Sequence, residues 1–319
     1  MKPEQATVIG GSGFIGRYIV RELAKRGTRV RVAVRNPNEA LFLKPMGDVG
    51  QILPVQANIR VPESIDRAVE GSEIVINLVG ILHQSGAQTF NAIQSEGPRI
   101  AAEAAARAGA TRMIQISAIG ADSKSDAAYA RTKAEGEAAV LEAFPNATIL
   151  RPSIVFGPED GFFNRFAAMA RLSPALPLIG GGETKFQPVY VCDVAEAVMA
   201  AVDSATAQGA TYELGGPRVY SFKELLEYIL AETQRSRLLV PLSFGLAKFI
   251  GFFAQMAPGT PLTPDQVELL KADNIVADDA RSLEDLGIAP TSVEAIVPTY
   301  LHRFRRHGQF DEHPVDAGA

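Results

Sequence analysis

Residues 7–16 read Thr7-Val-Ile-Gly10-Gly-Ser-Gly13-Phe-Ile-Gly16 and carry three glycines at intervals of three residues. The apolar run before them predicts a buried strand, and the run after them predicts a helix. A glycine turn between a strand and a helix is typical of a pyrophosphate-binding site, because backbone N–H groups and the positive helix end face the anion. We expect Gly10 to form the tight turn, Gly13 to admit the phosphates, and Gly16 to let the helix pack against the strand.

The first half of the chain alternates short apolar strands with helices. The expected strands are residues 6–9, 29–34, 52–55, 74–78, 113–117 and 147–150. The expected helices are residues 17–26, 62–69, an alanine-rich helix that ends near residue 108 and is interrupted at Pro98, and residues 127–143. This alternation predicts an α/β fold of the Rossmann type, with a doubly wound parallel sheet and right-handed crossovers.

After the sixth expected strand the alternation of strands and helices ends, because prolines and a glycine triplet interrupt it. We expect the nucleotide-binding domain to comprise residues 1–160 and about 187–215. A smaller, mostly helical C-terminal lobe comprises about 161–186 and 216–308, and residues 309–319 form a disordered tail.

Composition excludes several classes of protein. The 319 residues carry a net charge of -5, so no positive field is available for nucleic acid. A single cysteine, Cys192, rules out a disulfide framework, and the four scattered histidines predict no metal site. No apolar run reaches the roughly 20 residues that a membrane-spanning helix needs. The sequence leads almost directly into its first strand, so we expect no targeting peptide and a cytoplasmic location.

Arg35 follows the second expected strand, where an NAD-selective fold usually has Asp or Glu to bind the ribose 2′-hydroxyl. A guanidinium at this point can pair with a 2′-phosphate through charge-assisted hydrogen bonds. The other interpretation of Arg35 is a solvated surface arginine. We expect NADPH to be the cofactor and to bind in preference to NADH.

Tyr129 and Lys133 form the motif Tyr129-Ala-Arg-Thr-Lys133, and their spacing puts both on one face of an expected helix. With the GxxGxxG spacing of the glycine turn, this motif resembles the extended and atypical short-chain dehydrogenases/reductases. The resemblance implies that Tyr129 is the general acid/base, and that Lys133 lowers its pKa and holds the nicotinamide ribose. The other interpretation is a partly exposed tyrosine on an ordinary amphipathic helix.

Ser117 ends the fifth expected strand, where the resemblance implies a hydroxyl that binds the substrate oxygen. Extended members commonly carry it one or two residues later, and this chain has Ala118 and Ile119 there. The catalytic candidates are therefore Ser117, Tyr129 and Lys133. The candidate cofactor-binding residues are Gly10, Gly13, Phe14, Ile15, Gly16, Arg35, Asn58, Val79, Gly80, Tyr129, Lys133, Pro152 and Ile154.

A sharper resemblance rests on five stretches: residues 76–82, 117–122, 129–137, 151–160 and 186–191. In combination they resemble the NADPH-binding, dehydrogenase-like accessory subunit of respiratory complex I and its bacterial homologues. The resemblance runs from the glycine turn to about residue 290. It implies a tightly bound NADPH, a structural or assembly role near the quinone site, and a partner in complex I or at the cytoplasmic face of the inner membrane. Bacterial homologues often stand outside complex I, so membership of the complex stays open.

Two functions follow from these motifs. One is an accessory protein that binds NADPH without turnover, which Ala118, Ile119 and the whole-chain resemblance favour. The other is an NADPH-dependent reductase or epimerase that acts on a small or prenylated substrate, which the pair Tyr129 and Lys133 favours.

Residues 241–257 are strongly apolar, with Lys248 and Gln255 seven residues apart on one helix face. The segment is too short to cross a membrane. It is either a core helix of the second lobe or a docking helix for a partner or a bilayer surface.

Overall fold

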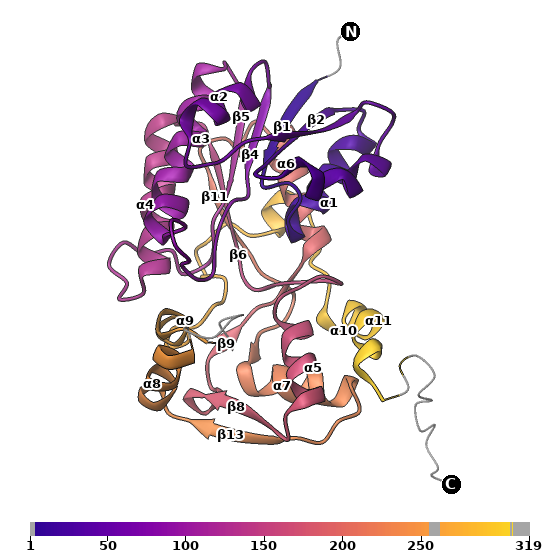
Figure 1. Ribbon diagram of the computed structural model, residues 1–319, viewed down its shortest axis with the longest axis vertical. Coiled ribbons are helices and arrows are strands. Elements are labelled where there is room, and N and C mark those ends of the chain that lie inside the picture. The colour runs from indigo at the N-terminus through magenta and orange to yellow at the C-terminus, as the bar shows by residue number, and fades with distance from the viewer. Residues whose placement is uncertain (1–3, 255–261, 307, 309–319) are drawn as a thin grey trace.

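Seven parallel strands form the central sheet of the chain, whose computed structural model describes residues 4–254, 262–306 and 308 (Figure 1). In spatial order the strands are β11 (Thr211–Leu214), β6 (Thr148–Pro152), β5 (Arg112–Ile116), β4 (Ile74–Asn77), β1 (Gln5–Ile9), β2 (Arg29–Val34) and β3 (Ile52–Gln56). Every neighbouring pair is parallel, which confirms the predicted doubly wound α/β fold. The chain reverses its direction of winding between β1 and β4, and ligands of such sheets bind at this switch point.

Helices cover both faces of the sheet, which is why its strands are apolar on both sides (Figure 1). One face carries α1 (Phe14–Lys25) and α6 (Val191–Asp203). The other carries α2 (Pro62–Val69), α3 (Glu96–Arg107) and α4 (Ala128–Ala143). A short 3₁₀ segment, η1 (Pro37–Met46), follows β2.

Two helix starts differ from the sequence prediction. Helix α1 begins at Phe14 rather than residue 17, directly after Gly13, so its N-terminus lies at the glycine turn itself. The alanine-rich helix restarts at Glu96, two residues before Pro98, after the π-helical turn η2 (Asn91–Ser95). Pro98 thus falls in the first turn of α3, where a missing N–H breaks no helical hydrogen bond.

A second group of elements packs around its own aromatic core, which includes Phe156, Phe163, Phe186 and Phe222. Its helices are α5 (Phe163–Leu172), α7 (Phe222–Glu232), α8 (Phe244–Ala254), α9 (Pro264–Leu269), α10 (Val293–Ile296) and α11 (Pro298–Leu301), with the 3₁₀ turns η3 (Gly180–Gly182) and η5 (His302–Phe304). We call this group the small lobe.

The small lobe is mostly helical, as predicted, and three short strand pairs also connect its segments to one another and to the sheet domain. They are β8 (Ala175–Ile179) with β13 (Leu238–Leu242), β9 (Lys185–Phe186) with β12 (Tyr220–Ser221), and β7 (Val155–Phe156) with β10 (Val189–Tyr190). Two-residue strands are too short to show a period in the sequence.

The chain returns to the sheet domain near its C-terminal end. Leu283 and Ile288, on either side of the 3₁₀ turn η4 (Glu284–Leu286), join the sheet core, and the backbone N–H of Glu213 donates to the carbonyl of Arg281 at 2.8 Å. The tail predicted at 309–319 lies outside the described residues. Among the helices that the structure describes, none is long and apolar enough to cross a membrane.

Candidate cofactor and active site

The glycine turn has the geometry of an anion cradle. Gly10 adopts φ +81°, which favours glycine, and its N–H donates to the carbonyl of Ala33 at 2.9 Å. A Cβ on Gly16 would lie 2.6 Å from the backbone of Gly11, so the first turn of α1 packs against the glycine turn too closely for any other residue. Gly13 is the N-cap of α1, and the first N–H groups of the helix therefore open onto the turn.

Phe14 and Ile15 contribute to this site through their backbone. Both side chains are half-buried and pack against the sheet core, and the Phe14 ring lies edge-on to Tyr18 at 6.2 Å. As the first residues of α1 they have N–H groups without intrahelical acceptors, which are suited to a pyrophosphate.

The adenosine end of the candidate cofactor site lies beside β2 and β3. Arg35 is exposed, and its Nη1 donates to Oε1 of Gln88 at 2.8 Å. Arg60 donates to the carbonyl of Ala87 at 3.2 Å, so two arginines hold the same turn. Asn58 closes the turn after β3, because its Oδ1 accepts the N–H of Arg60 at 3.1 Å.

The nicotinamide end lies at the carboxyl ends of β4, β5 and β6. A Cβ on Gly10 would come within 3.1 Å of Val79, so Val79 lies against the glycine turn. Gly80 is exposed, and a Cβ there would lie 3.4 Å from Nζ of Lys133. Pro152 ends β6, and Ile154 leads from it into the small-lobe core. The structure thus separates the candidates into two groups, one beside β2 and β3 and one at the carboxyl ends of β4, β5 and β6.

Lys133 is buried, and its Nζ donates to the carbonyl of Ile116 at 3.5 Å. The same Nζ lies 5.9 Å from the ring centroid of Tyr129. Burial lowers the pKa of Lys133 to about 8. An ammonium group with one long hydrogen bond has donors to spare, and this fits the hydroxyls of a ribose.

Tyr129 does not have the lowered pKa that the resemblance implied. Burial, and then the negative charge of Asp265, raise its pKa to about 12. Asp265 accepts hydrogen bonds from the backbone N–H groups of Ala128, at 2.7 Å, and Tyr129, at 3.2 Å. The ring of Phe90 lies edge-on to Tyr129 at 5.9 Å. The phenol therefore has an apolar wall and an anionic neighbour.

Ser117 has a buried hydroxyl with no hydrogen-bond partner among the described residues. Its backbone N–H donates to Leu150 at 2.7 Å, which fixes it at the end of β5. Ala118 and the buried Ile119 follow, so no hydroxyl stands in the later position. A buried hydroxyl needs a partner. The glycine cradle, the buried ammonium and this hydroxyl together fit a nicotinamide dinucleotide.

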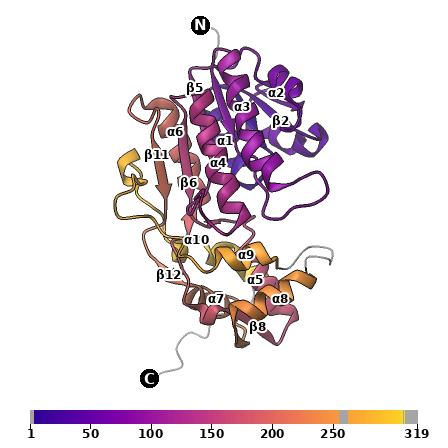
Figure 2. The same ribbon diagram turned by 90° about the vertical axis from the view of Figure 1, so that its left-hand side faces the viewer.

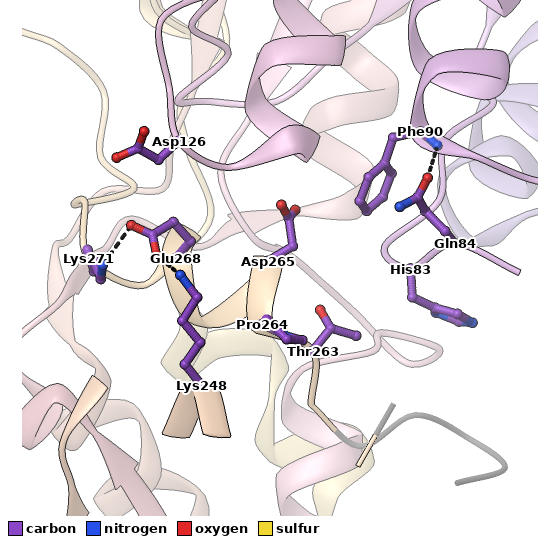
Figure 3. Close-up of a pocket in the computed structure, with 10 residues that line it drawn as sticks. All are labelled: His83, Gln84, Phe90, Asp126, Lys248, Thr263, Pro264, Asp265, Glu268 and Lys271. Carbon is purple, nitrogen blue, oxygen red and sulfur yellow. Dashed lines mark hydrogen bonds and ion pairs between the residues drawn. The ribbon is translucent and has the colours of Figure 1, made fainter. Parts of the chain in front are cut away.

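A polar cleft of about 630 Å³ lies between the sheet domain and the small lobe (Figure 3). Its lining includes His83, Gln84, Asp126, Lys248, Glu268 and Lys271. Phe90 and Asp265 also line it, and they connect it to Tyr129. None of Ser117, Tyr129 and Lys133 lines the cleft directly.

In the part of the chain that the structure describes, no group of three or more His, Cys, Asp or Glu side chains could hold a metal ion.

Sequence reasoning missed three features of this site. Glu137 makes a two-pronged ion pair with Arg151, at 3.0 and 2.6 Å, and so anchors α4 to β6. Glu137 lies one helical turn after Lys133. An acidic residue at this spacing from the motif was the sequence signal that could have indicated a further polar contact of α4. Asp265 lies in a Thr-Pro-Asp-Gln helix start, but nothing in the sequence indicates its distant partner on α4. Gln88 carries no sequence signal for its contact with Arg35.

The sheet order, the GxxGxxG turn and the Tyr129–Lys133 pair together define an extended short-chain dehydrogenase/reductase fold. The chain belongs to the NAD dependent epimerase/dehydratase family, whose model matches residues 6–215. This match confirms the resemblance expected from the motifs.

Individual relatives agree with this family. The chain is 38% identical over 315 residues to "NADH dehydrogenase [ubiquinone] 1 alpha subcomplex subunit 9, mitochondrial" of Arabidopsis thaliana, covering 95% of this chain and 78% of the relative. It is 34% identical over 193 residues to a ceramide reductase of Caulobacter vibrioides, covering 60% of this chain and 59% of that protein. A dTDP-glucose 4,6-dehydratase of Streptomyces venezuelae, crystallised with NAD and TYD, has the same fold with a TM-score of 0.73 at 19% identity, covering 95% of this chain and 97% of that one.

Proposed function

We propose that the protein holds NADPH as a bound component and serves as a structural, assembly or accessory factor linked to respiratory complex I or quinone metabolism. The observation that carries the proposal is the similarity to a subunit of mitochondrial NADH dehydrogenase over 95% of this chain, glycine turn and small lobe included. A peripheral position at the cytoplasmic face of the inner membrane follows from such a partner.

The environment of Tyr129 supports binding without turnover. A general acid/base works best with a pKa near the working pH. The pKa of Tyr129 is about 12, and the Asp265 carboxylate opposes the tyrosinate form. Ala118 and Ile119 leave the later substrate-oxygen position without a hydroxyl.

The cofactor contacts in this proposal are assigned by position. The glycine turn and the α1 N-terminus hold the pyrophosphate, and Arg35 pairs with the 2′-phosphate. Lys133 donates to the nicotinamide ribose. Asn58 lies at the adenine, and Val79, Gly80, Pro152 and Ile154 surround the nicotinamide. NADPH held in this way could supply a hydride from its nicotinamide ring to a substrate, if one were bound.

A second candidate function is an NADPH-dependent reductase or epimerase on a small or prenylated substrate. The specific observation in its favour is the buried Ser117 hydroxyl, free to bind a substrate oxygen, in a site that also retains Tyr129 and Lys133. A relative named ceramide reductase points to a lipid-like substrate. In this case Tyr129 would exchange the proton at the reacting oxygen.

The test is native mass spectrometry of the tagged protein, purified from detergent-solubilised membranes of its own host. We expect one NADPH to co-purify with each protein chain, together with subunits of the NADH dehydrogenase. The bound NADPH should stay reduced when the protein is stored with quinone and host lipids. Steady oxidation of NADPH on addition of a carbonyl lipid, abolished in Tyr129→Phe, would instead establish the reductase. Purification free of nucleotide and of those subunits would refute the accessory role.

A further inference from the structure

Most large side chains of α8 are exposed, although Phe244 at its start packs against the small-lobe core. Phe249 is 64% exposed and Phe252 and Phe253 are each 56% exposed, while Leu246 and Ile250 are also exposed. Ala247 and Gly251 are buried, and a Cβ on Gly251 would lie 3.2 Å from the backbone of residues 263 and 264. The helix therefore packs on α9 through small residues and presents an apolar face outward.

The exposed rings on α8 contact one another rather than the lobe core. The Phe249 and Phe253 centroids are 5.2 Å apart, and those of Phe252 and Phe253 are 5.4 Å apart. None of the three belongs to the small-lobe core. Of the two interpretations left open by the sequence, the core helix is therefore wrong for this face. Gln255, expected on one face with Lys248, lies outside the described residues.

Further exposed apolar side chains lie on the strand that leads into α8 and at the end of α5. Leu238, at 71% exposed, and Val240 belong to β13, and Leu172 lies just before β8, the partner of β13. Both views place α8, β8 and β13 at the end of the small lobe farthest from the sheet (Figures 1 and 2). We call the exposed side chains of Leu172, Leu238, Val240, Leu246, Phe249, Ile250, Phe252 and Phe253 the apolar end face.

The stretch of sequence that carries β13 and α8 has no acidic residue of its own. From residue 233 to residue 264 the sequence has no Asp or Glu, and its basic residues include Arg237 and Lys248. Arg237 donates to the backbone carbonyls of Ala170 and Ser236, which leave its positive charge unneutralised. Lys248 pairs with Glu268 at 3.2 Å. An apolar surface next to the guanidinium of Arg237, in a stretch of sequence without acids, fits an anionic lipid surface.

We propose that the apolar end face inserts into the headgroup region of an anionic bilayer, with α8 lying parallel to the membrane plane. An 11-residue helix is too short to cross a bilayer, whereas it is long enough to lie in the interface. This inference goes beyond the proposed function, because it names lipid as the bound surface and needs neither NADPH nor complex I.

The first test is sedimentation of the full-length protein with vesicles of phosphatidylcholine containing about one third phosphatidylglycerol. We expect the wild type to sediment, and Phe249→Asp with Phe253→Asp to lower partitioning by about tenfold or more. The matched control is Val49→Asp with Leu53→Asp, two exposed apolar residues of the sheet domain with the same charge change, which should sediment like the wild type. Binding should weaken at high salt and on pure phosphatidylcholine.

A second test uses the absence of tryptophan from the chain. Phe253→Trp supplies a single reporter whose emission should shift to the blue with vesicles and be quenched by brominated acyl chains. Val49→Trp should show neither change.

Several outcomes would overturn the inference. A wild type that stays in the supernatant would do so, and so would a collapse of the Tm in the Phe249/Phe253 double variant, which would return the rings to the core. Vesicle-free dimers that the double variant converts to monomers would assign the face to a second copy. The vesicle result is independent of nucleotide and of complex I, so its failure would leave the proposed function standing.

Discussion

The carboxylate of Asp265, on the small lobe, accepts a hydrogen bond from the backbone N–H of Tyr129 at 3.2 Å, across 136 residues of sequence. It also accepts the N–H of Ala128 at 2.7 Å. The N-cap residue of α4 is Ala127, whose side chain cannot accept a hydrogen bond, so Asp265 takes the place of a cap from another part of the chain. Since α9 lies between α4 and α8, the same lobe that carries the apolar end face also fixes the start of the Tyr129 helix (Figure 2).

Asp265→Ala should destabilise the protein by about 1–2 kcal/mol, because α4 loses two charge-assisted hydrogen bonds at its positive end. Asp265→Asn keeps a neutral acceptor and should lose less. Urea unfolding followed by circular dichroism measures both. Equal stability of Asp265→Ala and the wild type would show that the contact contributes nothing.

Arg35→Asp should weaken NADPH binding by about 10- to 100-fold and leave NADH little changed, because only NADPH has the 2′-phosphate that pairs with the guanidinium. Calorimetric titration of each nucleotide measures this. Arg29→Asp is the control, since Arg29 is exposed at the opposite end of the same strand. Equal affinity of the wild type for NADPH and NADH contradicts the role given to Arg35.

Tyr129→Phe should keep NADPH affinity within about twofold, because the phenolic hydroxyl faces the substrate side. Lys133→Ala should weaken NADPH by about tenfold or more, because the nicotinamide ribose loses a charged donor. The same titration compares the two. Loss of all nucleotide binding in Tyr129→Phe would mean that α4 does not lie as we assign it relative to the cofactor.

Lys133→Met should stabilise the nucleotide-free protein near neutral pH by roughly 2–3 kcal/mol, because burial disfavours the ammonium form. The pKa of Lys133 falls from 10.5, its ordinary value in an unfolded chain, to about 8 in the folded protein. Between these values the unfolded chain binds more protons, so the wild type gains stability as pH rises. The advantage of Met should therefore shrink from about pH 7 to about pH 9.5 in urea unfolding. A difference that does not change with pH rules out this cause.

Gly136→Ala should destabilise the protein by about 1–3 kcal/mol or more, since its Cβ would lie 2.0 Å from the carbonyl oxygen of Gln94. This close approach lets α4 pack against η2. Gly245→Ala is the matched control in α8, because nothing lies within 4 Å of its Cβ position. It should raise stability by roughly 0.5–1 kcal/mol through better helix propensity. Calorimetric Tm values check both, and a tolerated Gly136→Ala would mean that the two segments separate easily.

The sequence by itself determined the sheet half of the molecule. Strand and helix periods, the glycine turn and the spacing of Tyr129 and Lys133 are local patterns, so they correctly place the glycine turn between β1 and α1, and Tyr129 and Lys133 on one helix. The small errors fall at helix starts, such as Phe14 and Glu96, where one residue decides the boundary.

The tertiary structure alone decided which distant groups meet. Gln88 at Arg35 and Asp265 at Tyr129 join segments that no short-range pattern links. Burial, and then the charge of Asp265, raise the pKa of Tyr129 where the resemblance implied a lowered one. The orientation of α8 is likewise a tertiary result. Its sequence is apolar on nearly every side, so hydropathy could not say which face is buried. The close contact of Gly251 with the start of α9 settled that choice and left the large side chains outside.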